Sequence, residues 1–136
     1  MLSNLLFDYK LMAKKILIID DDKIFSKILR DWLLSGGQDK YEVTAVFDGA
    51  EGLEAVQREK PDLIMLDIVM PNMGGIEFLK KLRAETWGVD IPVIVETHLS
   101  DLGKMSEGVE LGVRGYIIKS DYSMDDILKQ IEDVLN

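Results

Sequence analysis

The chain has 136 residues, of which 47% are hydrophobic and 30% are charged. This is enough for one domain with a buried core, and it argues against a mainly disordered protein. The 16 basic and 25 acidic residues give a net charge of −9 at pH 7, which disfavours DNA or RNA as a direct partner, and the lack of cysteine excludes disulfides, thiol catalysis and cysteine-bound metals.

The first 13 residues differ from the rest of the chain. No charged-then-apolar signal segment opens the sequence and no apolar run approaches the roughly 20 residues of a membrane helix, so we expect a cytoplasmic protein without membrane contact. Leu2, Leu5 and Leu6 fall at helical spacing, but a short helix is marginal on its own. We therefore expect residues 1–13 to be an extension, either disordered or a short amphipathic helix, before a single domain at residues 14–136.

From residue 14 onward, short apolar runs alternate with amphipathic stretches. A continuous apolar run is typical of a strand buried on both faces, and apolar residues at helical spacing indicate a helix. Strands are predicted at or near residues 16–19, 41–47, 63–66, 93–97 and 116–118. Helical spacing marks residues 24–33, 53–56, 76–82, 105–111 and 127–135.

Local signals refine the ends of these elements. Gly36-Gly37 is predicted to end the first helix, and Asp48-Gly49 to form a turn. Ser123, with Asp126 three residues later, resembles a capping box for the last helix.

Five strand–helix alternations predict an α/β fold with a parallel sheet covered on both faces. Right-handed crossovers make such a sheet doubly wound. Ligands of these folds bind at the carboxyl ends of the strands, near the switch in strand order. The residues that follow the predicted strands are therefore the candidates for chemistry.

Acidic residues, a hydroxyl and an amine follow four of the predicted strands. Asp20 to Asp22 follow the first, Asp67 the third, Thr97 ends the fourth and Lys119 follows the fifth. Carboxylates brought together repel one another unless a cation lies among them, and carboxylates with a carbonyl and waters are the ligands that Mg²⁺ prefers. An amine and a hydroxyl across the same pocket can hold phosphoryl oxygens. The set therefore indicates a carboxylate that attacks phosphorus, although Asp22 is better interpreted as a cap of the first helix.

The sequence resembles the receiver domain of two-component response regulators, in the family's order and spacing over residues 14–136. The resemblance rests on these segments: Ile16 to Asp22, Asp48-Gly49, Leu66 to Gly75, Ile91 to Thr97, and Gly112 to Lys119. It implies a flavodoxin-like, five-stranded parallel sheet with strand order 2-1-3-4-5 and helices on both faces.

The resemblance also implies a role for each matching residue. Asp67 corresponds to the phospho-accepting aspartate. The expected Mg²⁺ (or Mn²⁺) ligands are Asp21, Asp67 and the backbone carbonyl of Val69, with Asp20 acting through water. Thr97 and Lys119 correspond to the hydroxyl and amine that hold the phosphoryl group, and Thr97 and Tyr116 to the switch pair.

Three residues depart from the family pattern. Ser120 stands where the family usually has a proline with a cis bond, so the loop after Lys119 is expected to differ. Glu96 replaces an apolar residue and His98 a small one, on either side of Thr97. Val69 and Leu99 are apolar where they flank the path of an attacking water, so we expect slow self-dephosphorylation.

The implied function is that of a phosphorelay receiver rather than an enzyme. A histidine kinase or a histidine phosphotransfer protein would donate the phosphoryl group. Phosphorylation would then change a protein-binding surface on the fourth helix, fifth strand and fifth helix, and the resemblance also permits a phosphorylation-linked homodimer.

Two alternatives remain open from the sequence. A receiver-like interaction scaffold that is never phosphorylated is compatible with the departures at Ser120, Glu96 and His98. A phosphatase like the haloacid dehalogenases would use Asp20 as nucleophile and Asp22 as acid, but it leaves the segment from Asp67 to Pro71 unexplained.

Overall fold

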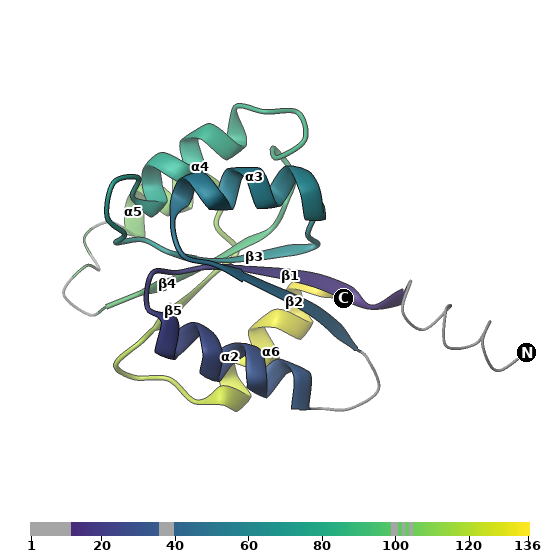
Figure 1. Cartoon of the computed structure of the whole chain (residues 1–136). Helices are drawn as coiled ribbons and strands as arrows, with labels where there is room; N and C mark the ends of the chain where they lie inside the picture. Colours follow the sequence, from purple (N-terminus) through teal and green to yellow (C-terminus); the bar gives the residue numbers. More distant parts are fainter. Residues whose placement is uncertain (1–11, 36–39, 99–100, 102, 104) are drawn as a thin grey trace, which may run out of the picture.

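The computed structural model describes residues 12–35, 40–98, 101, 103 and 105–136 (Figure 1). Strands and helices alternate along this part of the chain, as the apolar patterning predicts. The elements are β1 (Lys14–Ile19), α2 (Lys23–Ser35), β2 (Tyr41–Val46), α3 (Gly49–Glu59), β3 (Leu63–Asp67), α4 (Gly75–Arg83), β4 (Val93–Thr97), α5 (Met105–Glu110), β5 (Gly115–Ile118) and α6 (Met124–Leu135).

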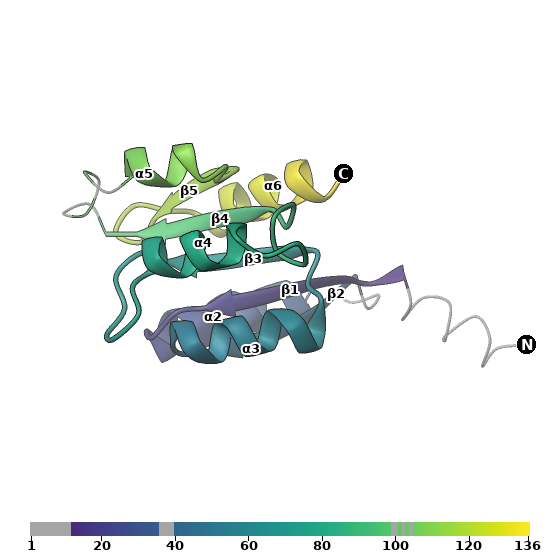
Figure 2. The ribbon, with the colours of Figure 1, turned by 90° about the horizontal axis from the view of Figure 1, so that it is seen from above.

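The strands form one parallel sheet in the order β2-β1-β3-β4-β5. Helices α2 and α6 cover one face, and α3, α4 and α5 cover the other (Figures 1 and 2). The predicted doubly wound fold and strand order are confirmed. The order reverses between β1 and β3, which places the switch point beside the ends of these two strands.

The core consists of two apolar layers, one on each face of the sheet. Ile16 and Ile18 of β1 point into the layer beneath α2 and α6, whereas Leu17 and Ile19 point into the layer beneath α3 and α4. Every residue of β3 is buried. Burial on both faces explains why these strands are continuous apolar runs instead of alternating ones.

Several predicted boundaries can be compared with the structure. Ser123 caps α6 as predicted, since its side chain accepts a hydrogen bond from the Asp126 N–H at 3.1 Å. Asp48 is the N-cap of α3 rather than part of a free turn, because its carboxylate accepts from the Glu51 N–H at 2.7 Å. The predicted helix stop at Gly36-Gly37 and residues 1–11 of the predicted extension lie outside the described residues.

Within the described part of the chain, no helix is both long and apolar enough to cross a membrane.

Candidate functional site

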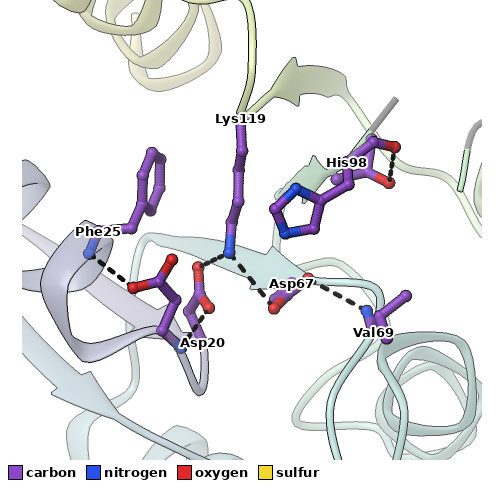
Figure 3. Close-up of polar contacts among 8 residues, drawn as sticks. Asp20, Phe25, Asp67, Val69, His98 and Lys119 are labelled. Carbon is purple, nitrogen blue, oxygen red and sulfur yellow. Dashed lines mark hydrogen bonds and ion pairs between the residues drawn. The ribbon is translucent and has the colours of Figure 1, made fainter. Parts of the chain in front are cut away.

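The carboxyl ends of four parallel strands meet at one edge of the sheet. In the register, Asp67 of β3 lies beside Glu96 of β4, and Thr97 lies beside Ile118 of β5. Asp20 directly follows β1, and Lys119 directly follows β5. The topology thus brings Asp20, Asp67 and Lys119 to one place, although up to about a hundred residues separate them in the sequence (Figure 3).

Three aspartates form a compact acidic cluster at this edge. Asp20, Asp21 and Asp67 each offer a carboxylate oxygen, and these oxygens all lie within 4.8 Å of one another. Asp20 and Asp67 are buried, whereas Asp21 is exposed. An exposed acid beside two buried ones, with oxygens this close, is a donor set that fits a hard divalent cation entering from solvent.

Lys119 reaches into the acidic cluster from the end of β5. Its Nζ lies 2.7 Å from Asp20 Oδ2 and 3.4 Å from Asp67 Oδ2, with only 4% of the side chain exposed. The ammonium also lies 5.0 Å from the ring centre of Phe25, which packs edge-to-face on Tyr122. Burial opposes the charge on Lys119, but the hydrogen bond to Asp20 and the surrounding carboxylates outweigh it and raise the pKa of Lys119.

The surroundings of Asp67 disfavour the ionised form of its carboxyl group. Burial and the negative charge of Asp20 raise the pKa of Asp67 to about 8, although Lys119 and the Val69 N–H favour its ionised form. The Val69 N–H donates to Asp67 Oδ1 at 3.1 Å and fixes one oxygen. The ionised form of this carboxylate therefore needs more positive charge nearby than Lys119 supplies.

The loop after β1 is held by its own aspartates. The Asp22 N–H donates to Asp20 Oδ1 at 2.9 Å, and Asp22 Oδ1 accepts from the Phe25 N–H at 3.0 Å in the first turn of α2. The interpretation of Asp22 as a helix cap is confirmed. The cap fixes the loop so that Asp20 points into the sheet edge while Asp21 stays at the surface.

The loop after β3 depends on a close approach of backbone at Gly75. A Cβ at this position would collide with the Asp67 carbonyl oxygen and lie 2.7 Å from Ile68 Cα. The Gly75 N–H also donates to the Ile68 carbonyl at 2.8 Å. Only glycine lets the start of α4 pack this tightly against the loop that carries Asp67 and Val69.

Thr97 and Tyr116, the predicted switch pair, come from neighbouring strands. Thr97 is buried, and its hydroxyl donates to the carbonyl of His98 at 3.2 Å. Tyr116 is half-buried against the second core layer, and a Cβ built on Gly108 of α5 would lie 3.0 Å from its hydroxyl oxygen. The Tyr116 side chain therefore extends towards α5, and burial raises its pKa.

Comparison with known proteins identifies the family. Residues 16–132 match the response regulator receiver domain. The chain belongs to this family. Receiver domains are the phosphoryl-accepting signalling domains of two-component systems and bind Mg²⁺ through an acidic pocket, and the structure contains a cluster of three aspartates.

Relatives of this receiver domain include longer proteins. The chain is 37% identical over 125 residues to a probable transcriptional regulator, ycf27, of Porphyridium aerugineum, covering 92% of this chain and 49% of that protein. It is 33% identical over 121 residues to response regulator MprA of Mycobacterium leprae, covering 89% of this chain and 50% of that protein. The receiver domain thus spans about half the length of the curated relatives it matches.

Solved structures include similar single domains. Chemotaxis protein CheY4 of Vibrio cholerae is 30% identical and superposes with a TM-score of 0.80, covering 90% of this chain and 99% of that one. The receiver domain of a signal transduction histidine kinase from Syntrophus aciditrophicus is 28% identical with a TM-score of 0.79, covering 90% of both chains.

The residues that depart from the receiver pattern have distinct environments. His98 is exposed at the end of β4 (Figure 3), and Leu99 lies outside the described residues. The bond between Lys119 and Ser120 is trans, as are all the described peptide bonds. Glu96, by contrast, is completely buried. Patterning alone marks Glu96 as a departure and gives it no role, because its burial beside Asp67 appears only once the strands are assembled.

Proposed function

We propose that this receiver domain accepts a phosphoryl group on Asp67 from the phosphohistidine of a histidine kinase or a histidine phosphotransfer protein. A carboxylate oxygen of Asp67 forms the new P–O bond while the P–N bond to the donor histidine breaks, and the leaving imidazole keeps the electron pair. The product is an acyl phosphate. The observation that carries the proposal is the buried Asp67 with Lys119 3.4 Å away and two further carboxylates beside it.

The surrounding residues would supply the charge that this step requires. Asp21, Asp67 and the Val69 carbonyl would ligate Mg²⁺ or Mn²⁺ directly, and Asp20 through water; the bound ion would neutralise phosphoryl oxygens. Lys119, whose Nζ lies 3.4 Å from Asp67 Oδ2, would pair with another of these oxygens. The ion would favour the ionised form of Asp67, whose pKa is about 8 even with Lys119 beside it, so that without the ion this carboxyl group would be mostly protonated at neutral pH.

Rearrangement of the Thr97 and Tyr116 side chains would couple phosphorylation of Asp67 to the surface of the domain. Phosphorylation adds roughly −1.5 to −2 charge, and the Thr97 hydroxyl would turn from the His98 carbonyl to a phosphoryl oxygen. Tyr116 would follow into the space that Thr97 leaves. Both side chains adjoin the surface formed by α5, β5 and α6, which would present the altered face to a downstream protein or to a second copy of the chain.

Phosphorylation by acetyl phosphate with Mg²⁺ tests the proposal, using intact-mass spectrometry on the receiver domain at residues 14–136 and on the whole chain. We expect one adduct of about 80 Da, the mass of a phosphoryl group, on the wild type and none on Asp67→Asn. Asp31→Asn, which removes an exposed carboxylate of α2, is the matched control and should be modified normally.

The result also separates the alternatives. An unmodified wild type would favour an interaction scaffold that is never phosphorylated. An adduct that persists in Asp67→Asn and disappears in Asp20→Asn would instead favour a phosphatase that uses Asp20 as nucleophile.

A further inference from the structure

The aromatic ring of Phe25 in α2 lies beside the ammonium of Lys119, and the proposed phosphoryl transfer gives it no role. Lys119 Nζ lies over this ring, 5.0 Å from its centre, and it also lies 2.7 Å from Asp20 Oδ2 and 3.4 Å from Asp67 Oδ2 (Figure 3). The ammonium thus contacts an aromatic face and two carboxylates. Because the Lys119 side chain is only 4% exposed, little water competes with these neighbours.

Two contacts hold Phe25 in place. Its N–H donates to Asp22 Oδ1 at 3.0 Å in the first turn of α2, and its ring packs edge-to-face on the ring of Tyr122 with 5.4 Å between the ring centres. Tyr122 follows Lys119 closely in the segment between β5 and α6. The segment that carries Lys119 therefore also carries the tyrosine that supports the ring beside the ammonium. Phe25 is 6% exposed, so its ring has little room to turn away.

The Lys119 ammonium lies between two carboxylates, and charge alone does not keep it beside one of them. A lysine carries a compact charge at the end of a flexible four-carbon chain. The nearer partner of Lys119 Nζ is Asp20, whereas the proposed phosphoryl acceptor is Asp67. An aromatic ring attracts a cation through its face and offers no oxygen that would accept a strong hydrogen bond. Phe25 can therefore limit the movement of the ammonium while the N–H groups stay available to Asp67 and to an incoming phosphoryl oxygen.

We propose that Phe25 is a positioning residue for phosphoryl transfer, whose ring keeps the Lys119 ammonium within reach of the Asp67 carboxylate. This inference rests on the proposed function. A cation stabilises developing negative charge best when it is in place before the reaction, and a small displacement of a positioned group lowers the rate strongly. Loss of the Phe25 ring should therefore slow phosphorylation through its effect on Lys119, in addition to any effect on packing.

The test follows adduct formation from acetyl phosphate in the whole chain with saturating Mg²⁺, by intact mass against time at several donor concentrations. Phe25→Leu removes the ring and keeps an apolar side chain, whereas Phe25→Tyr keeps the ring. We expect the maximal rate of Phe25→Leu to fall about fivefold, with little change in the donor concentration that gives half of it, and Phe25→Tyr to stay within about twofold of the wild type. Should Phe25→Leu not fold, Phe25→Met, which is also apolar and lacks the ring, takes its place.

Two further variants separate positioning from folding. Phe25 belongs to the core layer beneath α2 and α6, so its replacement also weakens packing. Leu33→Val is the matched control, because Leu33 is a buried residue of the same helix and the same layer; it should lower the melting temperature and still react at the wild-type rate. In a Lys119→Met background, adding Phe25→Leu should not change the rate further, because the ring then has no ammonium to hold.

The outcomes distinguish this role from the proposed function. A wild-type rate in Phe25→Leu, an equal loss in Phe25→Tyr or Leu33→Val, or the same fivefold loss in the Lys119→Met background would overturn the role of Phe25 alone, since the wild type would still accept the phosphoryl group. A wild type that forms no adduct would instead overturn the proposed function and, with it, this inference.

Discussion

Near each end of the parallel strands one cation contacts several oxygen atoms, and the oxygen atoms differ in charge between the two ends. At the edge opposite the acidic cluster, Arg83 of α4 donates to the carbonyls of Gly88, Val89, Ile91 and Leu111 at 2.9, 3.3, 2.7 and 2.9 Å. At the carboxyl edge, Lys119 lies among the carboxyl groups of Asp20, Asp67 and Glu96. The hydrogen-bond partners of Arg83 Nε and Nη1 are neutral carbonyls, whereas Lys119 faces more negative charge than it can balance.

This contrast suggests that Arg83 contributes to stability and Lys119 to function. The Arg83 guanidinium joins the segment after α4 to the end of α5 through backbone carbonyls, and a rigid fork with several donors suits that task. Burial lowers the pKa of Arg83, opposed by the charge of Asp90. The Lys119 ammonium is a point charge at the site where, in the proposed function, the negatively charged phosphoryl group is added and removed. The charge of Arg83 therefore needs no further ligand, whereas the negative charge around Lys119 would be balanced only by an additional cation.

Replacing Lys119 should have the largest effect on chemistry. Lys119→Met removes the ammonium closest to Asp67, so we expect the rate of adduct formation from acetyl phosphate to fall on the order of 100-fold. The rate is followed by intact mass against time. Lys23→Met, which removes an exposed lysine at the start of α2, is the control and should react at the wild-type rate.

Replacing Arg83 should give the reverse pattern. Arg83→Met leaves several carbonyls without their donor, which we expect to cost about 3 kcal/mol of unfolding free energy, measured by urea denaturation. Adduct formation in the folded protein should not change. Lys81→Met, on the exposed side of the same helix, should unfold like the wild type. A large loss of phosphorylation in folded Arg83→Met would contradict the division between the two edges.

The raised pKa of Asp67 predicts the sign of a pH effect on stability. An acid with a pKa of about 8 in the folded protein and about 4 in the unfolded chain binds more protons when folded, so its contribution makes the protein less stable as pH rises from about 4 to 8.

Asp67→Asn lacks this contribution. Its melting temperature in EDTA should exceed that of the wild type by several degrees at pH 8 and by little at pH 4.5. Mg²⁺ at pH 8 should reduce the difference, because it stabilises the wild type by binding the folded state. A difference that is constant with pH would show that the charge of Asp67 is not the cause.

The smallest expected effect concerns loss of the phosphoryl group. Val69 is 41% exposed beside Asp67 and has no polar atom to orient water in its side chain, so we expect the phosphorylated protein to persist for minutes or longer after acetyl phosphate is removed. Val69→Asn should shorten this lifetime by a few-fold, because an amide can hold the attacking water. A wild-type lifetime of seconds would contradict the interpretation.

Much of the fold was predictable because strands buried on both faces are continuously apolar in sequence. The apolar runs at residues 16–19 and 63–66 are too short for a typical helix, and the parallel arrangement of the strands then brings Asp20, Asp67, Thr97 and Lys119 to one edge. Asp48 was less clear, because Asp-Gly favours both a turn and a helix cap. The roles assigned to the site residues remain predictions.

Other features of the site depend on side-chain geometry and could not be predicted from patterning. Glu96 lies on β4 and Asp20 follows β1, and β3 lies between these two strands, so no local pattern connects the two residues. The hydrogen bond of Thr97 to the His98 carbonyl likewise reflects one choice of rotamer.

The aromatic pair beside Lys119 has a practical consequence. Phe25 lies 5.0 Å from the ammonium and 5.4 Å from the ring of Tyr122, at an interplanar angle of 84°. Tyr122 is 37% exposed, while the Lys119 side chain is almost inaccessible. A shift of the Lys119 ammonium would alter the packing of both rings. The ¹⁹F NMR signal of a fluorine label on the partly exposed Tyr122 would therefore report movement of the buried ammonium.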